Sequence, residues 1–195
     1  GQLGVGDNVN KNMPTQTNMK NVIDITAGYN FTAVLKKDGT VWVAGQNNYG
    51  QLGDGSTINS NSFHKVKLNG NGDYLENIVG IAAEGVTLHM LTADGEVYSC
   101  GYNYYGQFGA NYDTGYNANV YPKKMQKVSN IIQISAGDCN VEMLDADGTV
   151  WGVGYNNNGE LGIGDNSNRS LPQQMKTSDG KGIFSGVKEI ATGTY

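Results

Sequence analysis

The sequence predicts an all-β fold, a β-propeller built from four-stranded blades of about fifty residues each. The first observation is a recurring segment: Gly-Gln-Leu-Gly at residues 1–4 returns, with small changes, at 50–53, 106–109 and 159–162. The second is an Asp-Gly pair between two short apolar runs in each of three copies. The third is the lack of a sustained helical period, so we expect almost no helix. Short antiparallel strands repeated at this period favour radial stacking into blades.

The strands of each repeat are expected in a fixed order. First strands are predicted near residues 25–27, 81–83 and 134–136, and second strands at 31–35, 88–91 and 141–144. These runs alternate and are rich in Val, Ile, Thr and aromatic residues. Gly28 and Gly137 follow the first strand, where we expect a sharp turn. Third strands follow the Asp-Gly pairs, which tolerate the positive φ angles of tight hairpins. A fourth copy begins at Ile190.

Residues shared between the copies are interpreted as scaffold, because shared positions in repeat proteins build the fold. In the recurring segment they are Gly50, Gln51, Leu52, Gly53, Gly106, Gln107, Gly109, Gly159, Leu161 and Gly162. In the predicted hairpins they are Asp38, Gly39, Asp94, Gly95, Asp147 and Gly148. We therefore predict one repeat domain over residues 1–195, with approximate repeats at 1–49, 50–105, 106–158 and 159–195, the last incomplete.

The order of these elements resembles the regulator-of-chromosome-condensation (RCC1-type) repeat over essentially the whole chain. The matching elements are Ala-Gly, an apolar run, Asp-Gly-Thr-Val-Trp, Gly-x-Asn and Gly-Gln-Leu-Gly. The resemblance implies a seven-bladed propeller, of which this chain would cover about 3.5 to 4 blades. Repeats of that family usually carry a His after Ala-Gly, and the matching residues here are Phe31, Thr87 and Asn140. This departure favours a divergent, bacterial-like member.

The chain is short for a closed ring of the size that the resemblance implies, at about fifty residues per blade. We expect it to be part of a longer propeller. Two alternatives stay open: copies of the chain complete a ring between them, or the chain forms a four-bladed ring by itself. Open blades would expose strand edges, which makes self-association a further expectation.

The composition excludes some classes of function. A net charge of −5 argues against a nucleic-acid partner, which requires a basic surface. No apolar run reaches the length of a membrane span. The two cysteines, Cys100 and Cys139, are too few for a disulfide framework, and Cys100 is predicted to be a buried thiol. The acidic, Asn- and Gly-rich and cysteine-poor composition favours a secreted or cell-surface protein.

Candidate catalytic and metal-binding residues are few. His89 alternates with apolar residues in a predicted strand, and we interpret it as a structural histidine. No Gly-x-Ser-x-Gly elbow or phosphate-binding loop before a helix is present. Two oxygen-rich stretches, at residues 69–76 and 165–168, lack the calcium-loop pattern and are interpreted as solvated turns. We therefore expect no catalytic residue, no metal and no cofactor.

A partner surface is predicted where tyrosines gather. Tyr104, Tyr105, Tyr112, Tyr116 and Tyr121 lie close together in the third repeat or just before it. Tyrosine supplies a large contact area at small entropic cost, and Tyr among Asn and Gly resembles a binding loop. The alternative is that these rings pack beneath their own long loop.

An acidic rim is predicted on the same side of the propeller. The loops after the recurring segment share an acidic residue: Asp7, Asp54, Asp113 and Asp165. Equivalent loops of a propeller lie on one face, so these carboxylates would favour a basic or amphipathic partner. The alternative is that each Asp caps the backbone of its own turn.

The sequence therefore predicts a non-enzymatic scaffold that binds a protein partner, of unknown identity, through loops on one face. The family resemblance implies little more, because its members include an exchange factor for a small GTPase, a UV-B photoreceptor, ubiquitin-ligase domains and a bacterial β-lactamase inhibitor. Two alternatives stay open: an enzyme inhibitor like that bacterial protein, or a module for cell-surface glycans. Guanine-nucleotide exchange is not expected.

Overall fold

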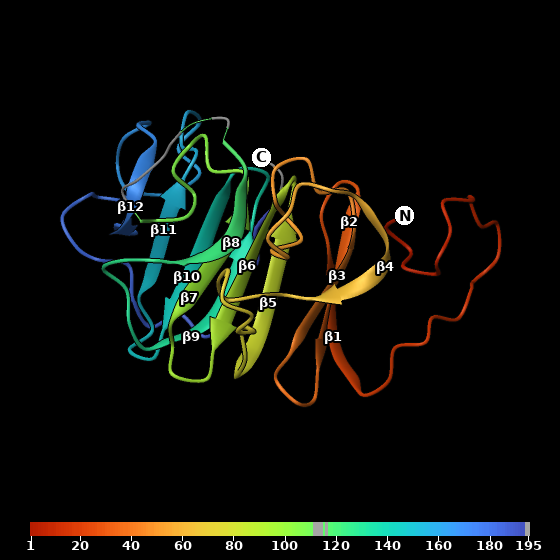
Figure 1. Ribbon diagram of the computed structural model, residues 1–195. Helices are drawn as coiled ribbons and strands as arrows, with labels where there is room; N and C mark the ends of the chain where they lie inside the picture. The colour runs from red at the N-terminus through yellow and green to blue at the C-terminus, as the bar shows by residue number, and fades with distance from the viewer. Residues whose placement is uncertain (111–114, 116, 194–195) are drawn as a thin grey trace.

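The chain folds into three antiparallel sheets that stand side by side as propeller blades (Figure 1). The computed structural model describes residues 1–110, 115 and 117–193, and these residues contain twelve β-strands and no helix. Blade 1 comprises β1 (Val22–Ala27), β2 (Phe31–Lys36), β3 (Val41–Gly45) and β4 (Ser60–Lys65). Blade 2 comprises β5 (Ile78–Glu84), β6 (Thr87–Thr92), β7 (Val97–Gly101) and β8 (Asn119–Lys124). Blade 3 comprises β9 (Ile131–Ala136), β10 (Asn140–Asp145), β11 (Val150–Gly154) and β12 (Arg169–Gln174). The all-β, four-stranded architecture is confirmed.

The Asp-Gly pairs form the predicted hairpins and also join each blade to the next. Gly39, Gly95 and Gly148 have φ angles of 75°, 76° and 81°, which favour glycine. The carbonyl of Gly39 accepts a hydrogen bond from the backbone N–H of Ile78 in blade 2 (3.0 Å). Equivalent bonds run from Ile131 to Gly95 (3.2 Å) and from Val187 to Gly148 (3.1 Å). Each hairpin therefore bonds to the segment that begins the next blade unit: β5, β9 and, after blade 3, the residues from Val187 onward.

Gly28 and Gly137 are required for a different reason from the one that the sequence suggests. Neither has a φ angle in the left-handed region, although residues 28–30 and 137–139 do connect the first and second strands. A Cβ atom on Gly28 would lie 2.1 Å from the ring of Phe31, and one on Gly137 would lie 2.2 Å from the amide oxygen of Asn140. Close packing, not a strained turn, excludes a side chain at both positions.

Apolar side chains fill the spaces between blades. One cluster joins Phe31, Leu35 and Val43 of blade 1 to Leu88 and Met90 of blade 2. A second cluster joins blades 2 and 3 through residues such as Leu91, Val97, Val141 and Met143. Adjacent residues of a strand point to opposite faces, so each sheet contributes to the interfaces on both of its sides.

The sequence repeats are offset from the blades. The recurring segments at 50–53, 106–109 and 159–162 lie in the connections between the third and fourth strands. A repeat counted from this segment therefore contains the last strand of one blade and the first three strands of the next. Residues 187–193, which include the start of the predicted fourth copy, lie along blade 3. The backbone N–H of Thr192 donates to Ser135 Oγ of blade 3 (3.0 Å). The equivalent bond between blades 1 and 2 runs from Ala83 N–H to Thr26 Oγ1 (3.0 Å).

Candidate interaction surface

The strand order places two sets of connections on one side of the propeller, which we call the motif-loop face. It consists of the third-to-fourth strand connections (described at 46–59, 102–110 and 155–168) and the first-to-second strand turns at 28–30, 85–86 and 137–139. The Asp-Gly hairpins and the connections between blades lie at the opposite end of the strands. Positioning on a rigid scaffold makes such loops the usual place for binding residues.

Three buried asparagines hold the recurring segments in shape. Asn47, Asn103 and Asn156 are fully buried, and their Oδ1 atoms accept hydrogen bonds from the backbone N–H groups of Leu52 (2.9 Å), Phe108 (2.9 Å) and Leu161 (2.8 Å). The sequence pattern contained these residues as Gly-x-Asn, but their role as the centre of each loop did not follow from the spacing.

The glutamines of the recurring segments lie buried at the blade junctions. Gln51 Oε1 accepts from Tyr49 N–H (3.0 Å), and Gln107 Oε1 accepts from Tyr105 N–H (3.1 Å). Gln107 Nε2 also donates to Thr87 Oγ1 (3.4 Å). In blade 1 the position equivalent to Thr87 is occupied by Phe31, which has no hydroxyl group. The buried Nε2 of Gln51 therefore has no hydrogen-bond partner among the described residues. The glutamines thereby fix the backbone that precedes each segment, where the tyrosines lie.

Five tyrosine rings form a continuous row across both blade junctions. Tyr49 meets Tyr102 edge to face with ring centroids 5.1 Å apart, and Tyr105 meets Tyr155 in the same way at 5.0 Å. Tyr104 stacks on Tyr102 (6.1 Å) and meets the edge of Tyr105 (5.0 Å). We call this row the tyrosine ladder. These are the offset and edge-to-face geometries that aromatic pairs prefer.

The repeat itself produces the ladder. Tyr49 and Tyr105 occupy one position of the repeat, immediately before the Gly of the recurring segment, and Tyr102 and Tyr155 occupy another, immediately after the third strand. When the blades pack, Tyr49 of blade 1 meets Tyr102 of blade 2, and Tyr105 of blade 2 meets Tyr155 of blade 3. Tyr104 is additional, because the other copies have Asn there, and it is 38% exposed.

The predicted tyrosines are only partly brought together. Tyr104 and Tyr105 lie in the ladder, but Tyr121 lies in β8 beneath the blade 1 connection, where its hydroxyl would be 2.5 Å from a Cβ atom on Gly55. Tyr112, Asp113 and Tyr116 fall outside the described residues. Tyr49, Tyr102 and Tyr155 were missed as surface candidates, because scaffold counterparts in other copies made them look structural.

The acidic residues of the predicted rim are bound to their own loops. Asp54 Oδ1 accepts from Ser56 N–H (2.9 Å), and Asp165 Oδ1 accepts from Ser167 N–H (2.9 Å). Asp165 also pairs with Arg169 (2.5 Å), and the Ser167 hydrogen bond and the Arg169 charge lower the pKa of its carboxyl. Asp7 pairs with Lys11 (2.7 Å). This geometry is that of the alternative interpretation, in which each Asp caps its own turn.

A second contact on the motif-loop face links blade 1 directly to blade 3. The hydroxyl of Tyr29 donates to Asp138 Oδ1 (2.5 Å), while its backbone N–H donates to the carbonyl of Gly85 in blade 2 (2.7 Å). The hydrogen bond to the carboxylate raises the pKa of Tyr29 to about 12. Tyr29 remains largely exposed, so the motif-loop face carries an aromatic residue beyond the ladder as well.

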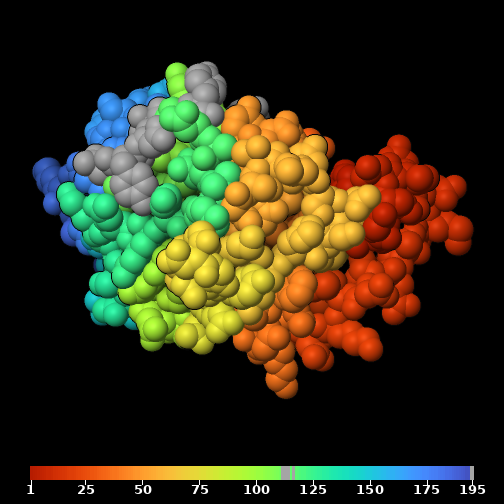
Figure 2. All heavy atoms as spheres, in the orientation of Figure 1, coloured from red at the N-terminus to blue at the C-terminus, as the bar shows by residue number. Residues whose placement is uncertain are grey.

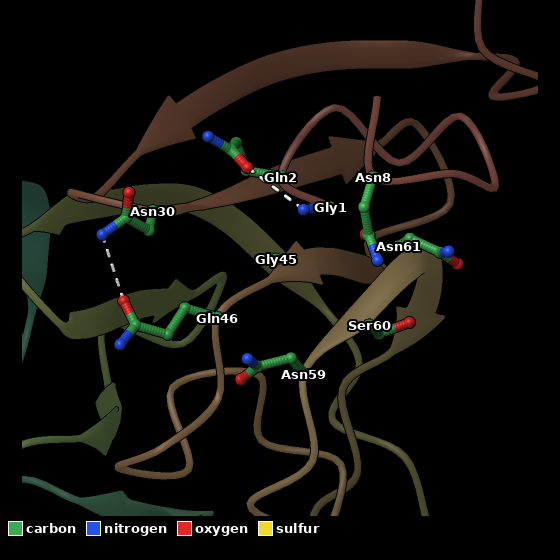
Figure 3. Close-up of a pocket in the computed structure, with 9 residues that line it drawn as sticks. All are labelled: Gly1, Gln2, Asn8, Asn30, Gly45, Gln46, Asn59, Ser60 and Asn61. Carbon is green, nitrogen blue, oxygen red and sulfur yellow. Dashed lines mark hydrogen bonds between the residues drawn. The ribbon is translucent and has the colours of Figure 1, made fainter. Parts of the chain in front are cut away.

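The ladder gives way to a polar pocket at blade 1 (Figure 3). Gln46 stands at the position of Tyr102 and Tyr155, and its Oε1 accepts from Asn30 Nδ2 (3.2 Å). The pocket has a volume of about 520 Å³. Its remaining side chains are mostly amides: Gln2, Asn8, Asn59 and Asn61, with Ser60. The side-chain chemistry of the motif-loop face therefore changes from aromatic to amide along its length.

His89 and Cys100 are buried within blade 2, away from this surface. His89 is buried and its Nδ1 lies 2.8 Å from Ser99 Oγ, and burial lowers its pKa to about 3. This confirms the structural histidine. Cys100 is buried as predicted, and both cysteines are free. Among the described residues, no group of three His, Cys, Asp or Glu side chains is placed to hold a metal ion, and no helix is long and apolar enough to span a membrane.

Blades of this geometry, with a recurring turn buried at each junction, define a propeller of the repeat class. A sequence profile of the Regulator of chromosome condensation (RCC1) repeat matches residues 1–35, 38–83, 94–139 and 147–195, and a related RCC1 profile matches residues 22–51. The chain belongs to the RCC1 repeat family.

Similar proteins are larger than this chain. The ultraviolet-B receptor UVR8 of Arabidopsis thaliana is 29% identical over 184 residues, which is 92% of this chain and 40% of the receptor. The human probable E3 ubiquitin-protein ligase HERC6 is 30% identical over 208 residues, 100% of this chain and 19% of the ligase. The crystal structure of Prp20p from Saccharomyces cerevisiae shares the fold, with a TM-score of 0.75 at 22% identity over 91% of this chain and 45% of that one. These relatives are eukaryotic and give no support to a bacterial, secreted protein.

Proposed function

We propose that the chain is a non-enzymatic scaffold whose motif-loop face binds a protein partner through the tyrosine ladder. The observation that carries the proposal is the continuity of five rings across three blades on one side of the fold. Tyrosines offer apolar area and a hydroxyl at low entropic cost, and they are enriched among residues that dominate binding energy.

Relatives support a protein partner. The report on the Prp20p structure describes the binding of that protein to Gsp1p and histones, and another structure holds Kap60 bound to yeast RCC1 (Prp20). Those partners belong to a protein of which this chain would cover less than half. For this chain they support only the general statement that propellers of this family present surfaces to other proteins.

The test compares two exposed tyrosines. Tyr104→Ala removes the most exposed ring of the ladder, while Tyr74→Ala removes a ring of similar exposure in the β4–β5 connection at the opposite end of the strands. Partners captured from a eukaryotic lysate by the immobilised chain, and purified Gsp1p and histones, serve as probes. Tyr104→Ala should weaken binding by about 1–3 kcal/mol and Tyr74→Ala should not. Equal affinity of both variants contradicts the assignment of the surface, and faster nucleotide release from a small GTPase in the presence of the chain contradicts a non-enzymatic role.

A glycan-binding module is the second candidate, and the polar pocket is the observation that favours it. Amide side chains such as Asn30 and Gln46 supply both donors and acceptors for hydroxyl groups. Binding to a sugar array that Asn59→Ala abolishes and Tyr104→Ala leaves unchanged would favour this candidate over the protein scaffold.

A further inference from the structure

The two ends of the strands differ in their charges. The lysines gather at the end that carries the Asp-Gly hairpins, which is the lower side of the molecule in Figure 1 and in Figure 2. They lie in the hairpins, before β1, at the ends of fourth strands and in the connections between blades: Lys20, Lys36, Lys37, Lys65, Lys67, Lys123, Lys124, Lys127, Lys176, Lys181 and Lys188. The two other cationic side chains, Lys11 and Arg169, are each paired with an aspartate of their own segment.

Ion pairs balance charges at the hairpin end but leave carboxylates unbalanced on the motif-loop face. The pairs at the hairpin end are Lys36–Asp38, Lys65–Glu76 and Lys124–Glu96. On or beside the motif-loop face, Asp54, Glu84 and Asp138 form no ion pair with a cation among the described residues. The sequence has no lysine or arginine within residues 46–59, 102–118 and 155–168. The motif-loop face therefore has a negative field.

The unbalanced carboxylates lie beside aromatic rings. The hydroxyl of Tyr29 in blade 1 donates to Asp138 of blade 3 (2.5 Å). Asp138 and, to a smaller extent, Glu84 of blade 2 raise the pKa of Tyr29, so carboxylates from two other blades lie near this ring. Asp54 belongs to the same connection as Tyr49, the first ring of the tyrosine ladder. Hydrogen bonds to Asp54 and Asp138 favour their charged forms, so their charges persist.

Aromatic rings combined with unbalanced carboxylates match the chemistry of the arginine side chain. The guanidinium group stacks on aromatic faces and binds carboxylates through two parallel hydrogen bonds. The lysine ammonium is a compact and strongly hydrated charge that fits such a surface less well. The negative field also disfavours acidic partners, because like charges across an interface cost free energy.

We propose that the motif-loop face recognises an extended segment of its protein partner that carries arginine side chains. This inference rests on the proposed function of the tyrosine ladder and specifies the chemistry of the partner. Alternate side chains of an extended segment point the same way about 7 Å apart, which is comparable to the 5.0–6.1 Å between neighbouring rings of the ladder. Successive arginines can therefore stack on the exposed parts of the ladder and pair with carboxylates beside it.

The probe is a fluorescent peptide in which arginine alternates with glycine, and its anisotropy is measured against the 195-residue chain. Matched peptides have lysine or glutamate in place of every arginine. We expect saturable binding of the arginine peptide, binding of the lysine peptide that is weaker by roughly threefold or more, and no binding of the glutamate peptide. Binding should weaken as salt is added, because salt screens charges that are exposed to solvent.

Three variants locate the binding surface. Tyr104→Leu keeps an apolar side chain but removes the ring, and it should weaken binding of the arginine peptide by roughly two- to fivefold. Asp138→Asn removes one charge and keeps an acceptor for the Tyr29 hydroxyl, and it should also weaken binding. Asp94→Asn is the matched control, because it removes the same charge at the hairpin end and Asn-Gly preserves the turn. It should leave binding unchanged.

The proposal is overturned if the arginine and lysine peptides bind equally, if no peptide binds at millimolar concentration, or if Tyr104→Leu has no effect. Equal effects of Asp138→Asn and Asp94→Asn would show a general attraction of charges and would overturn it too. A captured protein whose binding depends on Tyr104 but resists both high salt and Asp138→Asn would contradict the arginine assignment and leave the proposed function in place. A captured protein whose binding does not depend on Tyr104 would contradict the proposed function itself.

Discussion

Replacing the buried Asn47 by Asp tests whether the asparagine at the centre of each loop holds the fold together. Asn47 Oδ1 accepts from Leu52 N–H (2.9 Å). Its Nδ2 group donates to the carbonyls of Ser56 (3.0 Å) and Ile58 (3.2 Å) and to Asp54 Oδ1 (3.2 Å). The hydroxyl oxygen of Ser56 also lies within hydrogen-bond distance of Nδ2 (3.3 Å). Asn47→Asp has nearly the same shape and retains the acceptor, but it replaces a donor that serves four acceptors with a further acceptor.

The magnitude follows from these contacts. The fully buried Asn47 side chain loses its donor to the two carbonyls, at a cost of about 1–3 kcal/mol for each polar group left unpaired, and a carboxylate placed beside Asp54 adds like-charge repulsion. We expect a loss of about 3–5 kcal/mol at pH 7, which is a large part of the stability of an ordinary domain. Burial and the neighbouring charge raise the pKa of the introduced carboxyl, so the charge penalty is complete above that raised pKa and disappears as the pH falls below the ordinary Asp value.

Urea unfolding followed by circular dichroism at pH 7 and pH 4 measures this loss. The control is Asn48→Asp, which adds the same charge at the exposed neighbouring residue. Hydrogen exchange of the Leu52 amide reports the local effect, because it bonds to Asn47 directly. The reasoning is refuted if Asn47→Asp and Asn48→Asp unfold at the same urea concentration, or if the deficit of Asn47→Asp does not shrink at pH 4.

Three further predictions concern pH and packing. Burial raises the pKa of Glu142 to about 7, so the folded protein is destabilised as the pH rises from about 4.5 through 7 and this carboxyl loses its proton. Glu142→Gln cannot ionise and should therefore be about 1–2 kcal/mol more stable than the parent at pH 8, but no more stable at pH 4. Urea titrations at the two pH values measure the difference. Gly85→Ala should lower the thermal midpoint more than Gly72→Ala, because both have positive φ angles but only Gly85 would place a Cβ atom 2.8 Å from the carbonyl of Asp138. Tyr29→Phe should remove one tyrosine titrating near pH 12 from an ultraviolet pH titration, and an unchanged count of such groups would contradict the Asp138 hydrogen bond.

The sequence predicts what is local and misses what depends on the neighbouring repeat. The hairpin at Asp38 and Gly39 is encoded within a few residues, so spacing and turn chemistry are enough to find it. The burial of His89 can be predicted in the same way, because alternation along a strand decides which side chains face the interior. The contact of Tyr49 with Tyr102 is not accessible in this way, since the two rings come from different blades and meet only when the blades pack.

The interpretation of the acidic loop residues shows the same limit. Equivalent positions in a repeat do predict that Asp54 and Asp165 lie on one face. They do not predict whether a carboxylate points to solvent or back to its own backbone, because Asp serves both roles with the same short side chain. The donors that bind Asp54 and Asp165 are the backbone N–H groups of Ser56 and Ser167, two residues further on, and almost any residue at those positions would supply the same donor.

The hydrogen bond from each hairpin glycine to the following repeat has a consequence for how such chains diversify. Lengthening the Asp-Gly turn would move the Gly39 carbonyl away from Ile78 and alter the angle between neighbouring blades. In blade 1 the connection between the third and fourth strands also bonds to the next blade, through the backbone of Tyr49 and Gly55, but the length of this connection varies: it is longer in blade 2 than in blades 1 and 3. Insertions are therefore expected to accumulate at one end of the strands, so that a binding surface can be remodelled by evolution while the curvature of the ring stays fixed.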